Sequence, residues 1–340
     1  MVEDVRQRIL FVCSGVSKKM FKKGDSGITG GDVRLGEIMK GAITDGLEVH
    51  FLATSGAELF CQRVNLKGVI CHNFNFKSDP VGRFGFIFIA FRILFSPLPK
   101  TLKNFNNGTV YSANELLWDI FPALKLKLSN KDVRWAAVVH WVPPLKFWER
   151  RESKWYNSLM FLAAERLSVF FIKYFADAIL AVSESTARQL YSLRINGDKI
   201  FPVKCGVHFS EIDGLASKIK AKKFEAVFMK RIQAVKGVFD LVDIWAKVMR
   251  KKPKAKLAII GGGVDAQKLK QTIAEEKLEK NVVFLGEILD FEKKFKILSQ
   301  SKMFILPSYE ENWAIVMGEA MACRMPVLAY DLPELVEVWQ

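Results

Sequence analysis

The 340-residue sequence predicts an α/β protein made of two Rossmann-like domains. Its length exceeds the roughly 250–300 residues at which a single hydrophobic core stops growing, so two domains are expected. Half of the residues are hydrophobic and 12% are aromatic, which argues against a disordered chain. Short apolar runs alternate with helix-length segments, and this rhythm, typical of a parallel sheet, starts twice along the chain.

The first series of runs indicates an N-terminal domain. Runs rich in β-branched and aromatic residues at 9–13 (ILFVC) and 48–53 (EVHFLA) flank a helix-length segment. Further runs follow at 133–141 (VRWAAVVHW) and 176–183 (ADAILAVS). Because such runs are typical of strands in a parallel sheet, we predict a Rossmann-like domain over residues 1–204.

The second series restarts after Gly206 and indicates a C-terminal Rossmann-like domain over residues 205–340. Its five runs are EAVFMKR, AKLAIIGGG, NVVFLGE, KMFILPS and PVLAYD. Two such domains are expected to face each other across a cleft. Ligands of these sheets bind outside the carboxyl ends of the strands, so the residues directly after each run are candidates for a binding site.

The net charge of +15 is unevenly distributed. Residues 51–154 hold fifteen Lys and Arg against seven Asp and Glu, whereas residues 301–340 hold two against six. Such a field attracts nucleic acid, anionic lipid headgroups and phosphorylated small molecules. Ordinary solvated lysines on surface helices explain the excess equally well.

The sequence favours a cytoplasmic location. The five cysteines contain no C-x-x-C pair, which suggests buried thiols in a reducing compartment. The N-terminus lacks the basic region of a signal peptide. The most apolar stretch, residues 155–176, is interrupted by Glu165, Arg166 and Lys173, which would be costly inside a bilayer. A peripheral position on the inner membrane face remains compatible with these features.

Two features of the N-terminal half are candidate ligand contacts. Gly30 and Gly31 precede a helical segment, where backbone N–H groups can approach an anion, although a plain turn fits as well. These glycines lie too far beyond the first strand for a nicotinamide-binding fingerprint. His140 ends an apolar strand and can meet a ligand hydroxyl or phosphate, but a structural histidine held by the backbone is supported equally.

A pair of cations opens the second series. Arg231 and Lys236 stand just after a predicted strand and just before an amphipathic helix, and Gly237 permits close approach of the backbone. A guanidinium fork and an ammonium group at this spacing suit a diphosphate, with an exposed basic loop as the alternative.

Two acids, Glu311 and Glu319, are separated by seven residues near the end of the chain. A helix starting near Trp313 would carry Glu319, whose neighbours Val316 and Ala320 are apolar or small, so an exposed helix face explains it poorly. Two acids near a helix end that binds phosphate would be repulsive there unless they bind hydroxyl groups. Hydroxyl-rich ligands are sugars, so this pair of acids points to a sugar.

Together these motifs resemble glycosyltransferase family 4, the retaining nucleotide-sugar transferases of the GT-B fold. The resemblance covers most of the chain. It rests above all on TGGDVRLGEIMKGAITDGLEVHFLAT, AVFMKRIQAVKGVFDLVDIWAKV and ILPSYEENWAIVMGEAMACRMPVLAYDLPELVEV, the last containing the E-x7-E motif.

The resemblance implies a role for each candidate residue. Arg231 and Lys236 would hold the donor diphosphate, and positive charge there would stabilise the nucleotide leaving group. Glu319 would hold the ribose hydroxyls, and Glu311 would reach the transferred sugar. His140 would contact the sugar from the N-terminal domain. The remaining donor-site residues are Gly30, Gly31, Gly237, Ile288, and the backbone of Asn312, Trp313, Ala314 and Ile315.

The chain departs from the family pattern at several positions. Cys205-Gly206-Val207-His208 replaces the usual Asn-Gly-Val-Asp, Asn312 and Ala314 replace glycines, and Arg324 stands where glycine is common. The sequence stops at Gln340, where family members usually continue, so the C-terminal domain is expected to be incomplete.

The resemblance implies a metal-independent hexosyltransferase without a cofactor. It would move a sugar from a nucleotide diphosphate sugar, bound in residues 205–340, to a glycan or lipid-linked acceptor docked on residues 1–204. An anionic membrane surface is a further expected partner, and nucleic acid is not. Alternatives are a nucleotide-sugar epimerase or hydrolase of the same fold and an inactive nucleotide-sugar-binding protein.

Overall fold

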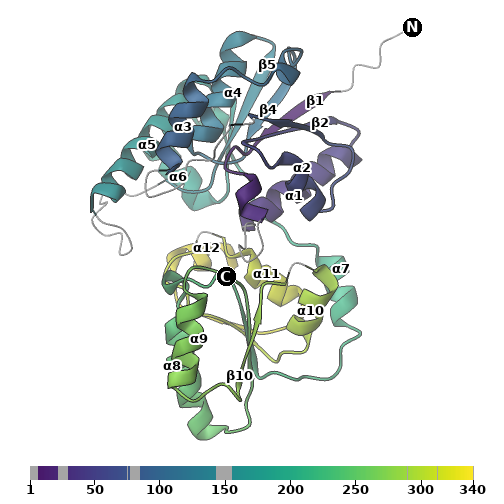
Figure 1. Ribbon diagram of the computed structural model, residues 1–340, viewed down its shortest axis with the longest axis vertical. Coiled ribbons are helices and arrows are strands. Elements are labelled where there is room, and N and C mark those ends of the chain that lie inside the picture. Colours follow the sequence, from purple (N-terminus) through teal and green to yellow (C-terminus); the bar gives the residue numbers. More distant parts are fainter. Residues whose placement is uncertain are drawn as a thin grey trace. The chain divides into compact units, whose positions relative to one another are not determined.

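The computed structural model describes residues 7–21, 30–74, 76, 85–142, 155–288, 290–311 and 313–339. The chain divides into two compact units, which we call unit 1 (Met1–Lys204) and unit 2 (Cys205–Gln340). Each unit contains one parallel β-sheet with packed α-helices (Figure 1). The predicted α/β class with two Rossmann-like sheets is therefore confirmed.

Unit 1 has a seven-stranded sheet within its described residues, in the order β3-β2-β1-β4-β5-β6-β7. Its strands are β1 (Arg8–Val12), β2 (Glu48–Ala53), β3 (Ile70–Asn73), β4 (Gly108–Ser112), β5 (Val133–Val139), β6 (Ala178–Ala181) and β7 (Ile200–Pro202). Its α-helices are α1 (Gly30–Thr44), α2 (Ala57–Arg63), α3 (Gly85–Phe95), α4 (Leu117–Ser129), α5 (Trp155–Phe175) and α6 (Glu184–Ser192). All four predicted runs form strands.

The central strands of unit 1 are apolar because both faces of the sheet are covered. Leu10 and Val12 of β1 belong to one buried cluster, whereas Phe11 between them belongs to another. Side chains alternate between the faces of a strand, so a strand buried on both sides needs a continuous apolar run. The three strands that the sequence did not predict, β3, β4 and β7, are shorter or more polar.

Unit 2 has a five-stranded parallel sheet among the described residues, in the order β10-β9-β8-β11-β12. Its strands are β8 (Ala226–Met229), β9 (Leu257–Ile260), β10 (Val282–Gly286), β11 (Phe304–Leu306) and β12 (Val327–Ala329). Its α-helices are α7 (Phe209–Ala216), α8 (Val238–Lys251), α9 (Ala266–Glu275), α10 (Phe291–Ser299), α11 (Ile315–Ala322) and α12 (Pro333–Trp339). Each of the five predicted runs contributes one strand.

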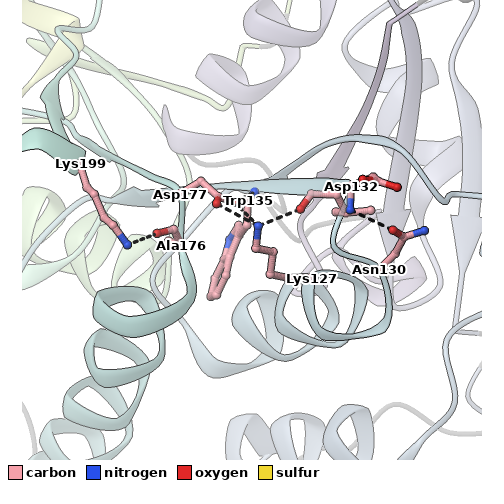
Figure 2. Close-up of polar contacts among 8 residues, drawn as sticks. Lys127, Asn130, Asp132, Trp135, Ala176, Asp177 and Lys199 are labelled. Atoms are coloured by element: carbon pink, nitrogen blue, oxygen red, sulfur yellow. Dashed lines mark hydrogen bonds and ion pairs between the residues drawn. The ribbon is translucent and has the colours of Figure 1, made fainter.

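An ionic contact ties α4 to the start of two strands in unit 1. The Lys127 ammonium donates to the Val133 carbonyl at 3.0 Å and to Asp177 Oδ1 at 2.9 Å. The other oxygen of Asp177 accepts the backbone N–H of Trp135 at 2.7 Å (Figure 2). Nearby, Lys199 donates to the Ala176 carbonyl at 3.0 Å. The Asp177 carboxylate thus connects α4, β5 and the residue before β6.

Replacing Asp177 with Ala should destabilise unit 1. The buried Trp135 N–H loses its side-chain acceptor, and such a loss costs about 1–3 kcal/mol in the free energy of unfolding. Urea titration monitored by circular dichroism measures the change. Asp132→Ala is the matched control, because the described residues offer its carboxylate no hydrogen bond or ion pair. Equal stability of the two variants would contradict the role of Asp177.

A buried carboxyl lies where the sheet of unit 1 changes direction, between β1 and β4. Asp119, in the first turn of α4, is fully buried. Its Oδ1 accepts the Ser14 N–H at 2.5 Å, and its Oδ2 accepts the Asn114 amide at 2.9 Å. Burial raises the pKa of Asp119 to about 7, although the two hydrogen bonds oppose that shift.

Asp119 should make the stability of the protein fall with rising pH. The unfolded carboxyl ionises near its ordinary pKa of 3.8 and the folded one near 7, so the folded state holds one more proton between these values. The free energy of unfolding should therefore decrease between about pH 4 and pH 7. Asp119→Asn should remove this component of the slope, measured by denaturant titration at several pH values. An unchanged slope in the variant would show that Asp119 ionises normally.

The described residues contain no helix that is both long enough and apolar enough to cross a membrane.

Candidate functional site

The charged residues of unit 2 gather where its sheet reverses direction. The chain builds β8, β9 and β10 toward one edge and then places β11 and β12 on the other side of β8. In open α/β sheets, ligands bind at this switch point, outside the carboxyl ends of the strands. The loops after β8 and β11 therefore form the candidate site.

Two ammonium groups converge on one carboxylate in these loops. Lys230 Nζ lies 2.7 Å from Glu311 Oε2, and Lys236 Nζ lies 3.2 Å from Glu311 Oε1. Lys236 also donates to the Glu310 carbonyl at 2.7 Å. The Glu311 side chain is only 4% exposed, and each lysine side chain is 18% exposed. The cluster of Lys230, Lys236 and Glu311 therefore carries one net positive charge close to solvent.

Burial and the neighbouring charges act in opposite directions on these groups. Burial alone raises the pKa of the Glu311 carboxyl, but the charges of Lys230 and Lys236 outweigh it and hold that pKa below its ordinary value. Burial lowers the pKa of Lys230, and Glu311 only partly offsets this effect. Glu311 is thus ionised and already compensated, so an arriving anion competes with it for the lysines.

Glycines allow the loops of the site to pack closely. Gly237 has φ +67°, and a Cβ there would lie 1.7 Å from the Pro307 carbonyl oxygen. Gly261 has φ +144°, and its Cβ would lie 1.9 Å from the Lys230 carbonyl oxygen. The Tyr309 N–H also donates to the Val235 carbonyl at 3.0 Å. Only glycine at 237 and 261 lets the backbones meet and brings the lysines to Glu311.

Glu319 forms a second ion pair on the following helix. It lies on α11, and Lys294 of α10 donates to its Oε1 at 2.8 Å. The Glu319 side chain is 14% exposed, and Lys294 is 20% exposed. As predicted, Glu319 does not lie on an open helix face.

The start of α11 has a left-handed residue. Ala314 precedes the helix with φ +48° and ψ +58°, a conformation that costs a non-glycine residue about 1–3 kcal/mol. The carbonyl of Trp313 accepts the indole N–H of Trp339 from α12 at 2.8 Å. Ile315 is the first helical residue, so the N-terminus of α11, with its partial positive charge, comes four residues after Glu311 in the chain. Asn312 lies outside the described residues.

The structure explains why glycine suits position 324. Arg324 follows the α11 helix with φ +58°, the left-handed conformation that often ends a helix. Its guanidinium forms two hydrogen bonds with the Asp213 carboxylate, Nε to Oδ1 at 2.6 Å and Nη2 to Oδ2 at 3.0 Å. This contact joins the end of α11 to α7.

The predicted residues do not all come together. Arg231 is exposed, and no described residue pairs with its side chain, whereas Lys230 takes the inner position. Ile288 follows β10 and packs against the apolar core of unit 2. Sequence reasoning missed Lys230 and Lys294. Lys230 directly follows the strand run AVFM, so its place at the carboxyl end of a predicted strand could have marked it as a site residue. Nothing in the sequence relates Lys294 to Glu319.

The other predicted residues belong to unit 1. Gly30 and Gly31 are the first two residues of α1. The backbone N–H of His140 donates to Glu115 Oε2 at 3.0 Å, and its Nε2 lies 3.0 Å from the Ala113 carbonyl oxygen. These contacts hold the imidazole at the carboxyl end of β5, which matches the structural alternative for this histidine. Its contact with a donor sugar stays a prediction.

No group of three or more His, Cys, Asp or Glu side chains within the described ranges is arranged to hold a metal ion. The candidate site is instead a cationic one, with two lysines, a compensated carboxylate and a helix N-terminus. Such a set binds anions, and phosphate in particular, by charge-assisted hydrogen bonds.

Sequence comparison with known families agrees with this geometry. The model of Glycosyltransferase Family 4 matches residues 28–211, more than half of the chain. The chain belongs to glycosyltransferase family 4. The model described as glycosyl transferases group 1 matches residues 213–340, so the two matches correspond closely to units 1 and 2 of this family 4 protein.

Individual relatives of the family 4 chain match shorter segments. Poly(glycerol-phosphate) alpha-glucosyltransferase of Bacillus subtilis is 28% identical over 120 residues, which are 35% of this chain and 17% of that protein. N-acetyl-alpha-D-glucosaminyl L-malate synthase of Bacillus anthracis is 29% identical over 114 residues, 34% of this chain and 29% of that protein. The chain thus spans less than a third of the length of these two relatives.

A solved structure matches the family 4 chain over nearly its whole length. The crystal structure of Anabaena Alr3699/HepE in complex with UDP and glucose has a TM-score of 0.68 and 16% sequence identity. The match covers 98% of this chain and 83% of HepE. With the two parallel sheets, this similarity confirms the expected GT-B fold.

Replacing Gly237 with Ala should disrupt the site. The new Cβ would overlap the Pro307 carbonyl oxygen, and the positive φ is unfavourable for alanine, so the loop after β8 must move away from Glu311. We expect a loss of about 1–3 kcal/mol in the free energy of unfolding. Thermal and urea unfolding measure it, with Gly214→Ala as control because nothing lies within 4 Å of a Cβ at position 214. Equal stability of both variants would contradict the close approach.

Proposed function

We propose that this chain is a retaining, metal-independent hexosyltransferase that uses a nucleotide diphosphate sugar as donor. The observation that supports the proposal most strongly is the cluster of Lys230, Lys236 and Glu311 at the switch point of unit 2. Two lysines on one buried carboxylate provide a site that a diphosphate can occupy by taking over the ion pairs now made to Glu311. Membership of family 4 and the UDP and glucose bound by HepE support the choice of donor.

In the proposed complex, Lys236 and Lys230 contact the diphosphate, and Arg231 reaches it from the exposed side of the loop. Glu319 accepts the ribose hydroxyls, in exchange for part of its ion pair with Lys294. Glu311, released from the lysines, accepts hydroxyls of the transferred sugar. The N-terminus of α11 carries a partial positive charge, which favours binding of both the diphosphate and the oxygens of the transferred sugar.

The reaction breaks the bond between the anomeric carbon and the phosphate oxygen, and the electron pair stays on that oxygen. An acceptor hydroxyl oxygen forms the new bond on the same face of the sugar, and its proton passes to the leaving phosphate. The lysines stabilise the charge that develops on the leaving group, and no metal is required for that role. The acceptor is a glycan or a lipid-linked hydroxyl compound, and the protein acts in the cytoplasm.

Replacing Lys236 with Ala should lower kcat about 10² to 10³-fold, because removing one group that stabilises developing charge typically has an effect of this size. Release of UDP or GDP from a panel of nucleotide sugars, with and without acceptor, measures the rate. Lys251→Ala at the exposed end of α8 is the control. An unchanged kcat in Lys236→Ala would refute its assignment.

The same assay separates the alternatives. Acceptor-dependent release of nucleotide supports the transferase. Isomerised or free sugar without acceptor would indicate the epimerase or the hydrolase instead, and calorimetric binding of nucleotide sugars without turnover would indicate a binding protein.

A further inference from the structure

Two cysteines of unit 1 face each other between a helix and a strand. Cys61 lies in the last turn of α2, and Cys71 is the second residue of β3. Their Sγ atoms are 3.8 Å apart, and both side chains are free thiols. We call these two residues the thiol pair. They form no C-x-x-C motif and are ten positions apart, so only the fold brings them together.

The alternation of side chains along β3 explains this contact. Successive residues of a strand point to opposite faces, so Cys71 and Asn73 share one face and His72 lies on the other. On α2, Ala57 and Cys61 are four residues apart and share one face of the helix. The Ala57 N–H donates to Asn73 Oδ1 at 3.1 Å. β3 therefore holds the first turn of α2 through Asn73 and meets its last turn at the thiol pair.

The two thiols differ in their access to solvent. Cys61 is 6% exposed and belongs to a buried apolar cluster on one face of the sheet. Cys71 is partly exposed, and its strand β3 stands at one edge of the sheet formed by the described residues of unit 1. A reagent in solution therefore reaches Cys71 first, with Cys61 in contact with it from the inside.

The thiol pair also makes Cys71 the more acidic of the two. A hydrogen bond from the Cys61 thiol lowers the pKa of Cys71, although burial and the charge of Glu58 oppose that shift. The same hydrogen bond, together with burial, raises the pKa of Cys61. The thiolate is the nucleophile in disulfide exchange, so an accessible thiol of lowered pKa reacts first.

We propose that Cys61 and Cys71 form a reversible disulfide and that small-molecule disulfides, such as oxidised glutathione, are the oxidants. The Cys71 thiolate attacks one sulfur of the oxidant, whose S–S bond breaks. The electron pair leaves on the other sulfur, which takes up a proton. Cys61 then loses its proton, and its sulfur attacks that of Cys71 and releases the second small thiol. The protein thus loses two electrons and two protons, and the oxidant gains both.

Only a small adjustment is needed to form this bond. The S–S distance of a disulfide is about 2.0 Å, so the two sulfurs must approach by about 1.8 Å. Cys61 lies in the last turn of α2, and helix ends fray more readily than helix centres. Because the sulfurs are already neighbours, the second step is intramolecular and has the advantage of proximity.

The disulfide fixes α2 at both ends, since Asn73 already holds its first turn. The segment before α2 contacts the loop after β1, where the N–H groups of Thr54 and Ser55 donate to the Val16 carbonyl at 3.1 and 3.4 Å. The thiol pair therefore acts on a helix that borders the carboxyl edge of the sheet. In a reducing compartment such a link is transient and follows the local ratio of disulfide to thiol. This inference does not rest on sugar transfer.

Mass spectrometry after glutathione treatment tests the proposal. The folded, reduced protein is incubated with increasing ratios of oxidised to reduced glutathione and quenched with acid, and the remaining thiols are alkylated in denaturant. We expect a peptide in which Cys61 and Cys71 are linked, with the loss of two hydrogen atoms and with reversal by dithiothreitol. If no such link forms at the highest ratio, or if it forms only when urea unfolds the chain, the proposal is wrong.

Two variants test the order of attack. In Cys61→Ser the reaction should stop at a mixed disulfide of glutathione with Cys71, whereas in Cys71→Ser the buried Cys61 should stay unmodified. Cys205→Ser removes another partly exposed thiol and is the matched control, which should form the disulfide as the wild-type protein does. Circular dichroism verifies that each variant is folded. Faster modification of Cys61 in Cys71→Ser than of Cys71 in Cys61→Ser would overturn the proposed attack by Cys71.

Discussion

The buried carboxylate of Glu311 is the interaction on which the candidate site depends. A buried carboxylate is costly unless it is paired, and here two ammonium groups compensate it. The pairing requires the loops after β8 and β11 to touch, which the glycines at 237 and 261 permit by having no Cβ at the point of contact. The same loops lie on adjacent parallel strands at the switch point, so fold, backbone packing and charge all converge on one place.

This arrangement has a consequence for ligand binding. The lysines are preorganised by Glu311, and a phosphate group replaces an interaction that already exists, so neither lysine must be desolvated anew. Glu319 of α11 is compensated in the same way by Lys294 of α10. Both carboxylates are thereby compensated by lysines. In the proposed donor complex, the donor would take over these cations, and the two carboxylates would accept hydrogen bonds from sugar or ribose hydroxyls.

Unit 1 is organised by a different physical constraint. Its sheet is buried on both faces, yet α3 and α5 keep large aromatic side chains in solvent and enclose an apolar pocket between them. Exposure of this kind opposes solubility unless another surface covers it.

The sequence by itself determined the α/β class, the two series of strands and the motifs that place the protein in glycosyltransferase family 4, because hydrophobic periodicity and short motifs are local properties. It also predicted Lys236, Glu311 and Glu319 as site residues. Only the tertiary structure decided that Lys230, rather than Arg231, pairs with Glu311, and that Lys294 pairs with Glu319. These partners lie 81 and 25 residues apart. Their contact follows from strand order and helix packing, which no local pattern encodes.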